Sequence, residues 1–122
     1  MRWLLLKLFF FSNFLFLQSY GQFWMNKGGG LSVDEGLDIS IDLNGNTYTT
    51  GYFTGSADFG TMNLVSNGSL DIFLVKTNGN GVVQWAVNSG GPGVDKALAV
   101  KNDQFGNSYI TGYFSGNANF GG

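Results

Sequence analysis

An internal repeat is the feature that most restricts how this chain can fold. Residues 24–60 align without a gap with residues 85–121, at a constant offset of 61 residues. Eighteen of the 37 aligned positions are identical, too many for composition to explain. The densest match is TTGYFTGSADFG at 49–60, which returns as ITGYFSGNANFG at 110–121. Such a period indicates a supersecondary unit whose copies pack on one another.

The pattern inside one unit is that of β-strands. Residues 37–43 alternate apolar and polar side chains, as a strand with one buried face does. Asn44-Gly45-Asn46 follows as a turn, and TYTTGYF at 47–53 is rich in β-branched and aromatic residues. These segments predict a hairpin. The second copy repeats it at 97–103 and 108–114.

A second hairpin is predicted between the two copies. DIFLVK at 71–76 has the continuous apolar middle of a strand covered on both faces. TNGNG at 77–81 is a turn, and VVQWAV at 82–87 is the partner strand. One unit therefore holds about four antiparallel strands, plus a short apolar piece at 62–65. No helical stripe occurs outside the first 21 residues.

The end of the repeated dozen is expected to leave the sheet. Gly55, Ala57, Phe59 and Gly60 are predicted to form an exit loop, with small residues where chains cross and an aromatic residue tucked back. The stretch 57–69 then holds the extra length of the unit, as a loop or a fifth strand.

Four antiparallel strands in tandem predict an all-β fold made of β-propeller blades. A β-solenoid or an open stack of sheets is the alternative. The units are 24–84 and 85–122, about one and two-thirds repeats, whereas closed propellers have about 4 to 8 blades. We therefore expect an incomplete propeller, either the N-terminal piece of a longer protein or a chain whose copies close a ring.

The first residues predict export. Arg2 and Lys7 precede a short apolar run at 8–17, and small residues end at Gly21. This is the pattern of a signal peptide over 1–21. A membrane-spanning helix is the alternative, but the run is shorter than the roughly 18 residues that a span needs. The mature segment 22–122 is expected to be secreted or at the cell surface, and not an integral membrane protein.

Composition excludes several function classes. The mature segment has four lysines against eight acidic residues, a formal charge of −4, so nucleic acid is not an expected partner. The chain has no cysteine and no histidine. Disulfides, the usual zinc sites and Ser-His-Asp or Cys-His catalysis are therefore absent from it.

A set of motif residues follows in a fixed order along the chain: Asp71, Phe73, Lys76, Gly81, Trp85, Gly90-Gly91, Asp95, Asp103, Gly106-Asn107, Tyr109, Thr111-Gly112-Tyr113-Phe114, Gly116, Ala118, Phe120 and Gly121. This ordered set resembles the SBBP-type β-propeller repeats of exported bacterial proteins. The resemblance covers nearly all of the mature segment. It implies a propeller fold in a secreted or cell-surface protein, in repeats that have no established catalytic role.

The recurring aspartates are the first candidates for chemistry. Asp34 and Asp95 form one pair of equivalents, and Asp42 and Asp103 the other. Paired carboxylates serve acid–base catalysis only when they share one site, whereas residues that occur once per repeat are distributed from unit to unit. We expect hydrogen-bonded turns instead. Residues 42–46 also resemble the start of a calcium loop, but its later ligand positions are not filled, so no metal site is assigned.

The recurring aromatic residues and glycines have two interpretations each. Trp24 and Trp85, with Tyr52-Phe53 and Tyr113-Phe114, suit a sugar-stacking platform or the packing between units, and packing is favoured. Residues 28–30 and 90–93 are glycine-rich, and we expect connecting loops there and not phosphate-binding loops.

The sequence therefore predicts a non-catalytic exported segment that acts as a structural scaffold or a binding and adhesion surface. Its ligand would be a protein or glycan of unknown identity, and no catalytic, cofactor-binding or metal residue is assigned. The alternative is the N-terminal part of a propeller-type polysaccharide hydrolase or lyase, with its catalytic residues beyond this chain. Self-association through open sheet edges and apolar strands such as 72–75 is a further expectation.

Overall fold

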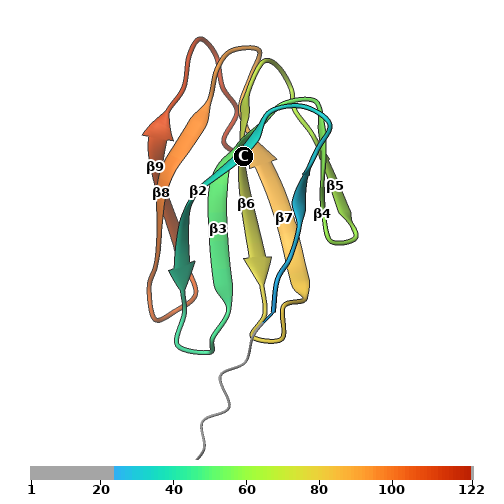
Figure 1. Cartoon of the computed structure of the whole chain (residues 1–122). Helices are drawn as coiled ribbons and strands as arrows, with labels where there is room; N and C mark the ends of the chain where they lie inside the picture. Colours follow the sequence, from blue (N-terminus) through green and yellow to red (C-terminus); the bar gives the residue numbers. More distant parts are fainter. Residues whose placement is uncertain (1–23, 122) are drawn as a thin grey trace, which may run out of the picture.

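The computed structural model describes residues 24–121, which form an all-β, antiparallel fold (Figure 1). The all-β, antiparallel part of the predicted fold is thereby confirmed, and its assignment to propeller blades stays a prediction. The predicted signal peptide at 1–21 lies outside the described residues. The strands are β1 (Gly28–Gly30), β2 (Asp34–Ile41), β3 (Thr47–Phe53), β4 (Ser56–Phe59), β5 (Met62–Val65), β6 (Asp71–Thr77), β7 (Val83–Ser89), β8 (Lys96–Asn102) and β9 (Ser108–Tyr113). Within residues 24–121 there is no helix that could cross a membrane.

The central sheet has the order β2-β3-β6-β7 and contains both hairpins predicted for the first unit. β3 pairs with β2 on one side and with β6 on the other, from Thr47 opposite Thr77 to Phe53 opposite Asp71. β6 is buried over almost its whole length, as its unbroken apolar run predicted. β2 is an edge strand, and a bulge at 36–38 shifts its register against β3.

Two expectations about loops were wrong. Ser56–Phe59 is not an exit loop but strand β4, which pairs with β5 and with β1. The glycine-rich loop expected at 28–30 is β1 itself. β4 alternates in burial, with Ala57 and Phe59 inside, and any side chain at Gly30 would collide with the Ser56 carbonyl. Since β1 and β4 are paired across a long stretch of chain, no local pattern revealed them.

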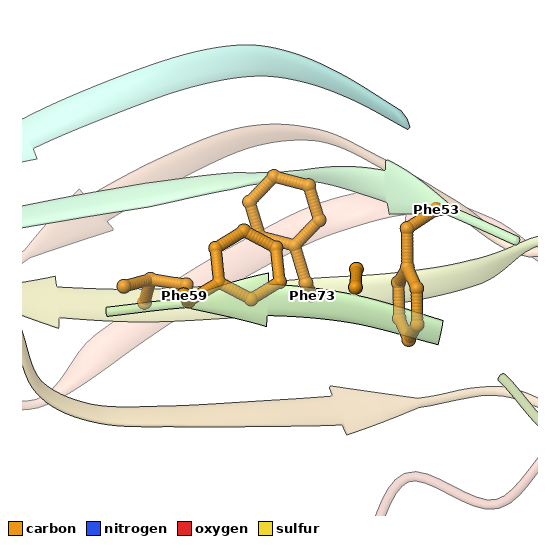
Figure 2. Packing of buried hydrophobic residues seen from close by; sticks show 5 residues of the cluster. Phe53, Phe59 and Phe73 are labelled. Carbon is orange, nitrogen blue, oxygen red and sulfur yellow. The ribbon is translucent and has the colours of Figure 1, made fainter. Parts of the chain in front are cut away.

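The larger core cluster lies between the central sheet and β4. It consists of Phe53, Ala57, Phe59, Phe73 and Val75. The Phe59 and Phe73 rings lie side by side, with centroids 4.8 Å apart, and Phe53 is farther along (Figure 2). All come from positions that alternate along β3, β4 and β6, so each strand gives one side of its pleat to this core.

A second core cluster joins the central sheet to the β8–β9 hairpin, which lies on the other side of it from β4 and β5 (Figure 1). Tyr48 from β3 and Leu74 from β6 pack against Val100 from β8, and Trp85 from β7 lies against them. Val100 is 1% exposed. The second unit is therefore docked on the first by a side chain at the middle of β8.

The second unit repeats two irregular features of the first. The bulge of β2 against β3 at 36–38 recurs between β8 and β9 at 97–99. The pairing of Gly29 with Asp58 recurs as a bridge between Gly90 and Asn119. Within residues 24–121 the three sheets form no closed ring.

Candidate functional site

Asp42 and Asp103, the first acidic candidates, each hold their own hairpin turn. Asp42 Oδ1 accepts the backbone N–H groups of Asn44 and Asn46, both at 2.9 Å. Its Oδ2 accepts the Asn46 amide at 2.7 Å and the Tyr48 hydroxyl at 3.2 Å. This is the Asx-type turn that the sequence predicted.

Asp103 makes the same four hydrogen bonds in the second unit. Its partners are the backbone N–H groups of Phe105 and Asn107, the Asn107 amide and the Tyr109 hydroxyl. The Asn46 amide lowers the pKa of Asp42, and the Asn107 amide lowers that of Asp103, because both donors favour the ionised carboxylate. With all their oxygens engaged inside separate turns, these carboxylates form no shared acid–base pair.

Asp34, the first residue of β2, and Asp95, directly before β8, each accept a hydrogen bond from the glycine-rich segment that precedes them. Asp34 Oδ2 accepts the Gly30 N–H at 2.6 Å, and Asp95 Oδ2 accepts the Gly91 N–H at 2.7 Å. The two sites differ at the other oxygen, since Asp95 Oδ1 accepts the Ser115 N–H at 3.1 Å whereas Asp34 Oδ1 is buried without a partner. No group of three or more acidic side chains converges in residues 24–121.

The two tryptophans are placed differently. Trp85 packs edge-on against Tyr48, with ring centroids 5.9 Å apart and an angle of 66° between the planes. Because Tyr48 also belongs to the cluster that Val100 enters, Trp85 contributes to packing between units, as the sequence predicted. Trp24 lies over the turn after β6, where a side chain at Gly81 would come within 2.8 Å of its ring.

Polar contacts also fix the second unit on the first. Asp38 Oδ2 on β2 accepts the Val100 N–H on β8 at 2.8 Å, and this bond lowers the pKa of Asp38. The Lys96 ammonium lies over the Tyr52 ring, 3.8 Å from its centroid. The Tyr52 hydroxyl donates to Glu35, which raises the pKa of Tyr52 because its proton is held by the carboxylate. The sequence pattern did not reveal these contacts, since none of their partners is near the other in the chain.

An exposed aromatic face lies on the second unit. Phe114 and Phe120 are 56% and 53% exposed, whereas their equivalents Phe53 and Phe59 are 0% and 7% exposed. The two exposed rings pack edge-on with centroids 5.3 Å apart. They line a hollow of about 360 Å³ together with Ile72, Ser89, Ser108, Ile110, Gly112 and Tyr113.

The missing cover of this face can be identified from the first unit. There, Phe53 and Phe59 are buried by Phe73 and Val75 of β6, the strand that pairs with β3. β9, the equivalent of β3, pairs only with β8 among the described strands. The second edge of β9 and the aromatic hollow are thus both uncovered. A strand like β6 would pair with this edge and cover the hollow.

Models of known protein families were searched and none matches the chain, and a search of curated proteins found no significant match.

Proposed function

We propose that this chain is a non-catalytic segment of an exported β-propeller, in which four-stranded units pack side by side and the assembly serves as a scaffold or binding surface. The observation that carries the proposal is the docking of the second unit by Val100 into the cluster of Tyr48, Leu74 and Trp85. Contacts of this kind between successive equal units are how repeat proteins gain stability.

The exposure of side chains on β2 supports the same arrangement. Ile39 is the equivalent of Val100, one repeat earlier, yet it is 54% exposed while Val100 is 1% exposed. Leu37 and Ile41 on the same strand are also exposed. In a continuing array, this face of β2 would pack against a preceding unit, as Val100 packs against Tyr48, Leu74 and Trp85 of the first unit.

The absence of a built catalytic centre in the described residues also favours a scaffold over an enzyme. The acidic candidates that recur are occupied by their own turns or by glycine N–H groups. In the proposed role, ligands would meet the loops at one end of the units, which vary without disturbing the sheets.

A strand-addition experiment tests the proposed architecture. A synthetic peptide of residues 71–89, which contains β6 and β7, is added to the purified chain. By the register of β3 with β6, peptide Thr77 should lie opposite Ser108 and peptide Ile72 opposite Tyr113. Because the chain has no cysteine, Ser108→Cys in the chain and Thr77→Cys in the peptide should form a disulfide under mild oxidation.

The matched control places the cysteine on β8 instead. Asn102 is directly opposite Ser108 but on the strand behind β9, so Asn102→Cys should not cross-link. Equal cross-linking at both positions, or none at Ser108→Cys, would contradict a unit that is completed by a β6-like strand. Release of sugars from polysaccharide by the purified chain would contradict the non-catalytic assignment.

A further inference from the structure

Two aspartates are buried next to each other, one at the first residue of β6 and the other directly before β8. Asp71 and Asp95 are both 0% exposed. Leu70 forms a β-bridge with Val94, and the Asp95 N–H donates to the Leu70 carbonyl at 2.8 Å. Asp71 and Asp95, which follow Leu70 and Val94, therefore lie on neighbouring segments of the chain. Of the two, only Asp95 has an equivalent among the described residues, Asp34, whereas the position equivalent to Asp71 is residue 10.

Three of the four carboxylate oxygens accept hydrogen bonds from N–H groups. Asp71 Oδ2 accepts the backbone N–H of Asn67 at 3.0 Å and its amide at 3.1 Å. Asp95 uses one oxygen for Ser115 and the other for Gly91. The fourth oxygen, Asp71 Oδ1, is buried and has no partner. A buried anionic oxygen without a partner is unfavourable, so this one needs a positive ligand.

Gly90 lies directly against both carboxyl groups. A Cβ atom at residue 90 would lie 2.8 Å from Asp95 Oδ2, 2.7 Å from Asp71 Cγ and 2.9 Å from Asp71 Oδ1. Both carboxyl groups thus border the same point beside Gly90, which a side chain at that position would fill. No lysine forms an ion pair with either aspartate in residues 24–121, so protein cations do not balance the two charges.

From this geometry we propose that Asp71 and Asp95 bind one calcium ion beside Gly90. Calcium takes oxygen ligands in flexible numbers and geometry, including carboxylates, amide and backbone carbonyls and water. The Asn67 side chain is already held at Asp71, and it borders a surface hollow of about 430 Å³ that also contacts Ser89 and Asn119, the neighbours of the Gly90 pairing. Zinc is disfavoured, since the chain has no histidine or cysteine.

Titration calorimetry of the chelator-treated chain with CaCl₂, beside MgCl₂, tests the site. We expect one calcium per chain with micromolar to millimolar affinity, and weaker binding of magnesium, which requires stricter octahedral geometry. The melting temperature should rise by about 10 °C at calcium a hundredfold above Kd. Absence of binding up to about 10 mM calcium would overturn the proposal, whatever the variants do.

Two isosteric variants locate the ion. Asp71→Asn should weaken calcium binding at least about tenfold by removing one ligand charge. Asp34→Asn is the matched control: Asp34 Oδ1 is also buried without a partner, but a Cβ atom at Gly29, the equivalent of Gly90, would meet Asp34 and no second carboxylate among its nearest neighbours. The calcium affinity of this variant should stay within about twofold of the unchanged chain, because the site requires the pair of carboxylates. Equal losses in both variants, or none in either, would place the ion elsewhere and contradict the site.

Gly90→Ala is the second probe, in case Asp71→Asn does not fold. Its methyl group occupies the point that both carboxyl groups border, so calcium should no longer raise the melting temperature. If calcium still stabilises Gly90→Ala as much as the unchanged chain, the proposal fails.

Discussion

At the scale of single residues, the repeat places identical side chains in different surroundings. Phe53 is fully buried, and its equivalent Phe114 is 56% exposed. Phe53→Ala should lower the free energy of unfolding by about 3–5 kcal/mol, as buried Phe to Ala changes do. Phe114→Ala should lower it by less than about 1 kcal/mol. Urea unfolding of both variants measures the difference, and equal losses would show that Phe114 is buried in solution.

Three aspartates with lowered pKa values, Asp38 on β2 and Asp42 and Asp103 in the turns, make stability depend on pH in a defined direction. The pKa values of Asp38, Asp42 and Asp103 are lowered in the folded state, so the stabilisation they give is complete above the ordinary value of 3.8 and is lost as pH falls below it. We expect the melting temperature to fall from about pH 5 to about pH 2.5. The double variant Asp42→Asn, Asp103→Asn should show a smaller fall. An unchanged slope in that variant would contradict the assignment.

The role of these aspartates was predictable because an Asx turn is local: its donors are two and four residues beyond the aspartate. The buried Asp71 and Asp95 pair was not. Its members are 24 positions apart in the sequence, and only the bridge between Leu70 and Val94 brings them together. Spacing along the chain carries no signal for such a contact.

At the scale of strands, the β8–β9 hairpin should come away from the central sheet without unfolding it. Val100→Asp puts a charge without a partner into the cluster of Tyr48, Leu74 and Trp85, which is strongly destabilising for a buried site. Trypsin should then cut faster after Lys96 and Lys101 in β8, with little change after Lys76 in β6.

Ile39→Asp is the matched control for that experiment. It makes the same kind of change at the equivalent position, but on the exposed face of β2. Cleavage after Lys96 and Lys101 should stay at the rate of the unchanged chain. Faster cleavage in both variants would show that the hairpin is loosened by added charge alone and not by loss of its docking residue.

The strands themselves were largely predictable, and the small sheet was not. β3 and β6 were evident from apolar and β-branched runs, and their turns from Asn and Gly residues. β1 and β4 were not predictable as strands, because Gly28–Gly30 has no side-chain pattern and SADF is short and flanked by glycines. Their pairing satisfies backbone groups over a long sequence separation, which local propensity does not report.

At the scale of the whole molecule, two open apolar faces should cause self-association. One is the aromatic face of Phe114 and Phe120, and the other is the exposed side of β2. With a net charge of only −4 on residues 22–122, electrostatic repulsion opposes association weakly. Light scattering after size exclusion should show mass rising with protein concentration.

The double variant Phe114→Ser, Phe120→Ser should shift that distribution toward monomer. Val65→Ser, which removes an exposed apolar side chain of β5, should leave it unchanged. A chain that stays monomeric at all concentrations would contradict the idea that these faces await a partner.

The one-sided docking of Val100 also determines where the native state first exchanges its amide protons. β3 and β6 are covered by strands on both edges and by a core cluster on each side, whereas β9 has an open edge and exposed side chains. In a linear array of units, openings begin at the least supported end. Hydrogen exchange should therefore be fastest in β9, slower in β8 and slowest in β3 and β6. Addition of the peptide of residues 71–89 should slow hydrogen exchange in β9 selectively, because β9 would then be paired on both edges.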